Sequence, residues 1–128
     1  MLTRQSVRVA TAADAVALGI ELPSWCVKWG GWVYPADEPV AMGAVCWDAK
    51  DWAVCFFTAC GQVPPVVAHR TAWRAMRWLR ETGGARRILT VPDETKPRAA
   101  EWLRRLGFRP TETVIPGIDA ALWECDVK

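Results

Sequence analysis

Histidine is almost missing from this sequence, which contains a single one, His69. Metal sites built on two imidazoles are therefore excluded. The five cysteines form an odd set without a CxxC pair, which argues against a disulfide framework and against a zinc knuckle. We expect reduced cysteines that pack in the core, and no metal site. A pair of Cys60 and His69 would have no third residue to orient it, so no catalytic residue is predicted.

A membrane-spanning segment and an excess of one charge are also absent. No apolar run approaches the roughly 20 residues that a spanning helix needs, and the opening stretch MLTRQSVRVA has no signal-peptide core. The 16 Lys and Arg face 14 Asp and Glu, which gives a formal net charge of +2. We expect a cytoplasmic protein that binds neither a membrane nor a specific nucleic acid.

Apolar bulk is abundant. Hydrophobic residues make up 52% of the 128 residues, and nine of them are tryptophans. A disordered chain does not carry so much large apolar surface. The length fits one domain of ordinary size, so the sequence predicts a single domain over residues 1–128.

Six segments have the alternating or short apolar pattern of strands. They are residues 6–11, 40–47, 52–60, 86–91, 108–115 and 120–127. The second and third are joined by the turn DAKD, which is the spacing of a tight antiparallel hairpin. Residues 23–39, rich in Trp, Gly and Pro, predict an irregular loop that enters a short strand near Trp32.

Three segments carry helical signals, namely residues 12–22, 66–82 and 96–107. Thr11 and Asp14 resemble a capping box at the start of the first. Gly83 and Gly84 are expected to end the second helix, and Gly107 the third. This order of strands and helices predicts an α+β fold.

The order of the elements, with PRAAEWLRRLGFRP near the end, resembles the GNAT fold of the Gcn5-related N-acetyltransferase superfamily. The last helix of that fold commonly ends in LGF before an antiparallel strand. The resemblance covers about Val40 to Arg109. It implies a GNAT-like mixed, mostly antiparallel sheet with helices packed on both faces. It also implies that the strands around Val54 and Leu89 run side by side and parallel, splayed at one end.

The cofactor loop departs from the family pattern. In the family, an acetyl-CoA loop written Q/RxxGxG/A starts the long helix, where backbone N–H groups hold the pyrophosphate. Here the matching stretch is QVPPVV. Gln62 fits the first position, but Pro65 and Val67 stand where glycine or alanine belongs, and prolines have no N–H to donate. We expect no cofactor; if acetyl-CoA binds nevertheless, the candidate residues are Gln62, Val67 and Arg70.

The proton donor of the family is replaced as well. Counting back from LGF, Lys96 takes the place of an asparagine, and Leu103 that of the tyrosine that protonates the departing thiolate. A leucine cannot donate a proton. The strand at 52–60 holds no carboxylate that could serve as a general base, and Asp48 and Asp51 are predicted to be turn residues.

Two functional hypotheses follow. The stretch PVAMGAVCWDAKDWAVCFFTAC, a Trp-bearing hairpin before a basic helix, is similar to small internal virion proteins of short-tailed bacteriophages, which resemble GNAT domains. That similarity implies a virion-associated structural or assembly protein without conventional acetyl-CoA catalysis. It would lie in the cytoplasm or within a phage particle, with other proteins, including virion components, as its partners. The alternative is an acetyl-CoA-dependent N-acetyltransferase with a divergent cofactor loop.

Tryptophan and arginine supply the candidate contacts with other proteins, because both are enriched at interface hot spots. Eleven Lys and Arg face four Asp and Glu between Arg70 and Arg109. The predicted interface consists of Trp25, Trp29, Trp32, Arg74 and Arg77. The tryptophans in the helical segments, Trp73, Trp78 and Trp102, are expected to pack on the sheet.

Overall fold

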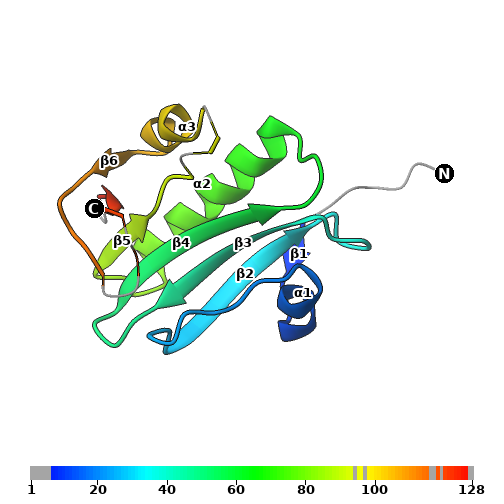
Figure 1. Ribbon diagram of the computed structural model, residues 1–128, viewed down its shortest axis with the longest axis horizontal. Helices are drawn as coiled ribbons and strands as arrows, with labels where there is room; N and C mark the ends of the chain where they lie inside the picture. Colours follow the sequence, from blue (N-terminus) through cyan, green and yellow to red (C-terminus); the bar gives the residue numbers. More distant parts are fainter. Residues whose placement is uncertain (1–6, 94, 97, 116–117, 119, 127–128) are drawn as a thin grey trace.

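The computed structural model describes residues 7–93, 95–96, 98–115, 118 and 120–126 (Figure 1). In chain order its elements are β1 (Arg8–Val9), α1 (Ala12–Ala17), β2 (Lys28–Tyr34), β3 (Ala41–Trp47), β4 (Trp52–Ala59), α2 (Pro65–Glu81), β5 (Arg87–Thr90), α3 (Ala99–Arg105), β6 (Phe108–Pro110) and β7 (Trp123–Cys125). None of the helices in the described ranges is long and apolar enough to cross a membrane.

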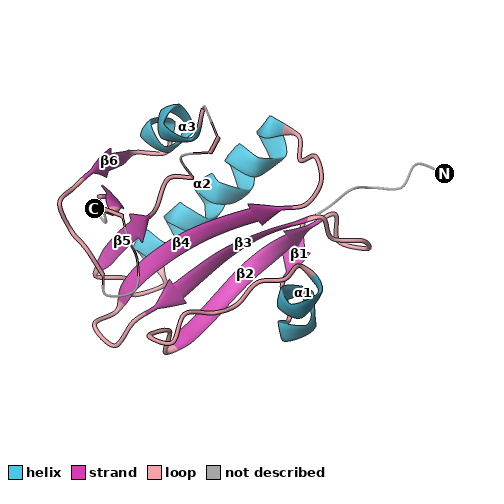
Figure 2. Cartoon of the chain, viewed as in Figure 1, coloured by secondary structure: helices cyan, strands magenta, loops and turns pink. Residues whose placement is uncertain are grey.

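The seven strands form one sheet in the order β1-β2-β3-β4-β5-β7-β6 (Figure 2). Five of the six neighbouring pairs are antiparallel, and β4 with β5 is the parallel one. In that pair Val54 lies opposite Leu89, which confirms the predicted parallel strands. A mixed, mostly antiparallel sheet with helices is the fold class that the sequence predicts.

Helices cover both faces of the sheet. On one face, α1 packs Ala15 against Val33, Met42 and Ala44. On the other, α2 contributes Met76 and Leu79 to the largest cluster, and α3 with the residue that follows it contributes Leu103 and Leu106. A third cluster joins β4 and β5 to the segment before β7 and contains Val54, Leu89, Ile115 and Leu122. The core is therefore split by the sheet into two layers.

The start of α1 forms as predicted. Asp14 N–H donates to Thr11 Oγ1 at 3.3 Å, and Thr11 N–H donates to Asp14 Oδ2 at 2.7 Å, so the capping box is confirmed. Arg8 in β1 adds two hydrogen bonds to the Asp14 carboxylate, at 2.7 and 2.9 Å. The helix ends sooner than residues 12–22 suggest, because Gly19 adopts a φ of +70° two residues beyond Ala17.

The β3–β4 hairpin also forms as predicted, with Asp48 as a turn residue. Asp48 Oδ1 accepts hydrogen bonds from the N–H groups of Lys50 and Trp52, at 2.8 and 3.0 Å. Such side-chain bonds to the following backbone are typical of an Asx turn. Asp51, the other predicted turn residue, has a φ of 62° and follows Lys50 directly.

Strand lengths differ from the sequence prediction in two places. β2 is a full strand that includes Trp29, so the irregular loop ends earlier than expected. The expected strands at 108–115 and 120–127 shrink to β6 and β7; residues 6 and 127 lie outside the described part of the chain. The pairing becomes irregular beyond Pro110, because Thr111 N–H donates to Leu122 O at 3.1 Å whereas Leu122 N–H donates to Thr113 O at 2.9 Å. The Thr111 hydroxyl also donates to Leu122 O, at 2.6 Å.

Candidate functional site

The sheet opens between β4 and β5 beyond Cys55. The parallel ladder runs from Trp52 opposite Arg87 to Cys55 opposite Thr90, and there β5 ends. β4 continues to Ala59, paired only with β3 in this part. At the last rung, Thr90 Oγ1 donates to Cys55 O at 2.8 Å. The strands thus separate at one end, as the resemblance implies.

The loop after β4 leads directly into the N-terminus of α2. Four N–H groups at the start of a helix normally lack a partner within it. Here Pro64 caps the helix and Pro65 is its first residue, so two of these groups do not exist. Val67 N–H donates to Pro64 O at 2.9 Å. Among the residues that the structure describes, Val66 N–H alone at this helix start has no partner.

The three candidate cofactor residues lie around this loop but differ in setting. Gln62 is exposed and lines an open hollow beside Pro35 and Val40. Val67 is half-buried and faces the cavity beneath α2, so its side chain fills space where a glycine would leave access. Arg70 is exposed and makes no ion pair with any described residue.

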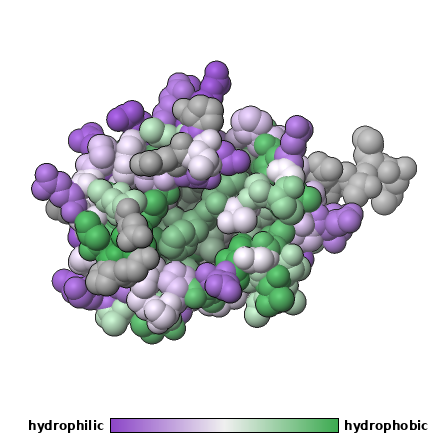
Figure 3. Space-filling model, in the orientation of Figure 1, coloured by the Kyte–Doolittle hydropathy of each residue, from purple (hydrophilic) through white to green (hydrophobic). Residues whose placement is uncertain are grey.

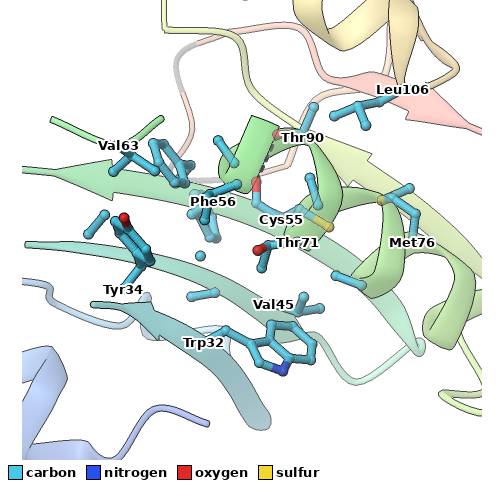
Figure 4. Close-up of a pocket in the computed structure, with 18 of the residues that line it drawn as sticks. Trp32, Tyr34, Val45, Cys55, Phe56, Val63, Thr71, Met76, Thr90 and Leu106 are labelled. Atoms are coloured by element: carbon cyan, nitrogen blue, oxygen red, sulfur yellow. Dashed lines mark hydrogen bonds between the residues drawn. The ribbon is translucent and has the colours of Figure 1, made fainter. Parts of the chain in front are cut away.

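An apolar cavity of about 100 Å³ lies between α2, α3 and the floor formed by β2, β3 and β4 (Figure 4). Its floor includes Trp32, Tyr34, Gly43, Val45 and Cys55. Figure 4 places Tyr34 and Val63 at one end and Met76 and Leu106 at the other. No Asp, Glu, Lys, Arg or His is among the described residues that line it.

The Cys55 thiol of this cavity is a poor catalyst, and Tyr34 supplies the other ionisable side chain of the described lining. Burial raises the pKa of the Cys55 thiol to about 12, and Cys125 nearby adds a smaller effect in the same direction. A thiol with such a pKa is protonated at neutral pH and is a weak nucleophile. Leu103, at the position of the family's tyrosine, is buried and lines the cavity, so that position does face the cavity with an apolar side chain.

The cysteines are all free thiols within the described part of the chain. Burial raises the pKa of Cys46 to about 12, and the neighbouring Cys26 adds a smaller effect in the same direction. Cys60, by contrast, is exposed. In the described ranges, no group of three or more His, Cys, Asp and Glu side chains could hold a metal ion.

The three tryptophans of the predicted interface pack into three different clusters. Trp25 packs beside Phe56 with ring centroids 6.5 Å apart, Trp29 packs with the α1 cluster, and Trp32 packs with the α2 cluster. Trp29 and Trp32 both lie in β2. The structure therefore does not gather these three side chains into one patch.

The outer face of α2 carries the remaining candidates. Arg74 and Arg77 are exposed, and Arg77 Nε lies 3.2 Å from Glu81 Oε1. Trp73 is 49% exposed and Trp78 is 42% exposed, so the expectation that both pack on the sheet is wrong for Trp73 and only partly met by Trp78. Trp78 contacts the Trp47 ring edge-on at 6.0 Å. Trp102 does pack against the α2–α3 cluster.

Sequence reasoning missed Trp73 as a surface residue and the cavity as a whole. The helical pattern near Trp73 contains Ala72, Ala75 and Met76, which suggested one wide apolar stripe that included the tryptophan. A usable signal was its spacing, because Trp73 lies three residues after Arg70 and four before Arg77, on the charged side. In Figure 3 hydrophilic residues also gather along the upper margin, where Figure 1 places α3.

No protein-family model matches the chain, and no curated protein sequence matches it. Solved structures do. A spermidine N-acetyltransferase from Vibrio cholerae, in complex with CoA and spermine, matches with a TM-score of 0.62 at 13% identity, covering 94% of this chain and 92% of its own. A chimera of the Vibrio cholerae enzyme with hSSAT matches with a TM-score of 0.61 at 13% identity, covering 95% of this chain and 93% of its own.

A protein from Sphaerobacter thermophilus assigned as an acetyltransferase gives a TM-score of 0.57 at 14% identity, covering 92% of this chain and 89% of its own. At such identities the similarity establishes the fold alone. The β4–β5 opening and the helix that follows β4 are the features that the resemblance to the GNAT fold implies. The chain has the fold of the GNAT acetyltransferases.

Proposed function

We propose that this protein is a GNAT-fold component that does not carry out conventional acetyl-CoA-dependent transfer and works through contacts with other proteins. The observation that carries the proposal is the start of α2. A pyrophosphate needs several converging N–H donors, and this helix start offers only Val66 N–H among its described residues. Arg70 could reach a phosphate with its side chain, but a side chain does not restore backbone donors.

The cavity supports the same proposal, because the position of the family's proton donor holds a leucine; the Tyr34 hydroxyl, from β2, is the remaining candidate acid in the described lining. Leu103 cannot protonate a leaving thiolate, and Cys55 keeps its proton at neutral pH. The described lining contains no carboxylate and no histidine. A protein of this fold with these residues is better suited to binding than to acyl transfer.

The outer face of α2 is the proposed contact surface. It presents Trp73 between Arg70, Arg74 and Arg77, all exposed. The single acidic residue of the helix, Glu81, is already paired with Arg77. The positive charges of Arg70 and Arg74 are therefore not neutralised by a residue of α2 and can attract an acidic partner. Tryptophan flanked by arginine is the composition of an interface hot spot, and an acidic protein surface fits it.

The predicted contact through Trp25, Trp29 and Trp32 stays a prediction. Each of these side chains is half-buried in its own cluster, so each has an exposed part that a partner could touch. Replacing them would also disturb the core. For that reason the α2 surface gives the cleaner test.

We propose phage particles as the place of assembly, reached from the cytoplasm, on the sequence resemblance alone of the β3–β4 hairpin and the following basic helix to small internal virion proteins. The test compares the wild type with Trp73→Ala combined with Arg74→Glu, in cells that natively make the chain. We expect the wild type to sediment with phage particles and the variant to remain soluble. A matched control, Arg86→Glu, changes an exposed arginine away from α2 and should still sediment. If the folded variant sediments like the wild type, the α2 contact is wrong.

One observation favours a second candidate, an acetyl-CoA-dependent N-acetyltransferase with a divergent loop. The apolar cavity lies beside the β4–β5 opening and receives Val67 from the start of α2. In that case Gln62, Val67 and Arg70 would contact acetyl-CoA. Release of the CoA thiol from acetyl-CoA in the presence of amine acceptors would favour this candidate, and its absence would favour the first.

A further inference from the structure

The cavity exists because small residues face each other across it. Gly43 on the β3 floor lies in the same lining as Ala68, Ala72 and Ala75 of α2. A Cβ added at Gly43 would have only Phe56 O near it, at 4.0 Å. Larger side chains at these positions would fill the space. The cavity is therefore a consequence of the small residues at these positions and not of poor packing of α2.

The interior is poorly suited to water and to charge. A buried water needs two to four polar partners. Thr90 Oγ1 is already committed to Cys55 O, and burial keeps the Cys55 thiol neutral. The hydroxyl of Thr71 makes no hydrogen bond with any described residue, and Figure 4 places this side chain in the middle of the lining. Of the three lining hydroxyls, Thr90 is paired with Cys55 O and Tyr34 has an interaction of its own, which leaves the Thr71 hydroxyl for a ligand. A hydroxyl in an apolar hollow favours an uncharged ligand with one hydrogen-bonding atom.

We propose that this cavity binds a small uncharged molecule with an apolar body about the size of a benzene ring and one oxygen that pairs with Thr71. Apolar cavities of about 150 Å³ stay dry and take up benzene. This one measures about 100 Å³ and is not closed, so part of the ligand can extend from it. The ligand carries no phosphate, so the missing donors at the start of α2 do not affect it.

The entrance lies at the Tyr34 end. Tyr34 and Val63 line both the cavity and the neighbouring open hollow, which also includes Gln62, Pro64 and Pro65. That hollow carries no charged side chain among its described residues. An uncharged molecule can therefore enter without passing an ionic group. An anion would lose its hydration there without a cation to pair with.

The test uses phenol as the probe and the methionine methyl groups as reporters. Met76 lines the cavity, whereas Met42 is buried on the opposite face of the sheet. With methyl-labelled methionine, we expect phenol to shift the Met76 signal saturably, with a dissociation constant on the order of 1 mM or tighter, and to leave Met42 in place. No saturable shift, or equal shifts at both methyl groups, would overturn the proposal.

Four comparisons sharpen this result. Gly43→Val fills the floor and should weaken phenol binding about tenfold or more, while Gly30→Val, on β2 with open space around its Cβ and outside the lining, should leave it unchanged. Thr71→Val should weaken phenol about three- to tenfold but not benzene. Benzoate and coenzyme A should not move Met76; if either binds as tightly as phenol, the ligand class is wrong.

Folding of the variants is checked by the Met42 signal and by urea unfolding. Gly43→Val places a β-branched residue in a strand, so its unfolding midpoint should equal or exceed that of the wild type. If it fails to fold, Gly43→Ala makes the same test with one added carbon. A folded Gly43→Val or Gly43→Ala variant that binds phenol as the wild type does would overturn the proposal.

Discussion

Two adjacent glycines in β2 tolerate a side chain very differently. A Cβ at Gly31 would lie 2.5 Å from Gly43 O and 3.3 Å from Ala44 Cα, on the neighbouring strand. A Cβ at Gly30 would meet nothing within 4 Å. The close approach of β2 to β3 therefore depends on Gly31 and not on Gly30.

The prediction is that Gly31→Ala lowers the free energy of unfolding by about 1–3 kcal/mol, because the strands must separate to admit the methyl group. Gly30→Ala should be neutral or stabilise by up to about 1 kcal/mol, since it removes freedom from the unfolded chain. Urea unfolding of both variants measures this. Equal effects of the two substitutions would show that the strands do not approach as described.

The ion pair between Arg8 and Asp14 makes stability depend on pH. Hydrogen bonds from Arg8, and then from Thr11 N–H, hold the pKa of Asp14 well below its usual range. An unfolded aspartate has a pKa of about 3.9. The stabilisation is therefore complete above that pH, and it is lost as the pH falls through the lower pKa of the folded state.

Asp14→Asn should therefore lower the free energy of unfolding at neutral pH, and the gap to the wild type should shrink below about pH 4. Urea unfolding across this range gives both values. Glu112→Gln, which changes an exposed carboxylate, serves as the control and should give no such gap. A gap that stays constant down to low pH would contradict the role of the charged pair.

Local residue patterns were predictable where the partners are close in the chain. Thr11 and Asp14 lie three residues apart, and their capping box was predicted. The pairing of Arg8 with Asp14 was not, because it depends on how β1 turns into α1. Cys55 and Leu103 come from distant segments, and only the fold brings both to one cavity.

At the scale of elements, α2 decides what the scaffold can hold. Its N-terminus keeps Pro64 and Pro65 where the resemblance expects a glycine-rich turn. Proline is well tolerated at the first position of a helix, so the helix itself loses nothing. What is lost is a set of N–H groups that only a ligand would use.

Pro64→Gly combined with Pro65→Gly restores two N–H donors at this helix start. We expect the double variant to bind coenzyme A more tightly than the wild type does, by calorimetry under identical conditions. Glycine also loosens the helix start, so folding is checked by circular dichroism. Pro92→Gly, a proline change away from this loop, is the control. An unchanged affinity in a folded double variant would mean that the prolines are not what limits binding.

Elements with strong periodicity were predicted best. The hairpin of β3 and β4 and the long helix came from continuous apolar patterns, and the parallel pair came from the resemblance to the GNAT fold. β2 was underestimated because Gly30 and Gly31 interrupt the strand signal. β6 and β7 were overestimated because their pairing becomes irregular beyond Pro110, where Leu122 bonds to the backbone of both Thr111 and Thr113. Such an irregularity is decided by tertiary contacts.

For the whole molecule, we propose that the fold of the family is kept without its cofactor chemistry. The sheet order, the opening after Cys55 and the solved acetyltransferase structures all agree on the scaffold. The start of α2 and the apolar position of Leu103 depart from what catalysis with acetyl-CoA needs. The sequence could predict these departures because they are single residues within a recognisable order of elements.

Direct titration of the wild-type protein with acetyl-CoA tests this separation most closely. Isothermal titration calorimetry up to millimolar cofactor should give no saturable heat, because two of the N–H groups at the start of α2 are missing and a pyrophosphate needs several converging donors. A protein whose folded state is verified by its unfolding transition should be used. A saturable heat with a dissociation constant in the low micromolar range, which corresponds to a binding free energy of about −8 kcal/mol, would contradict the proposed loss of the cofactor site.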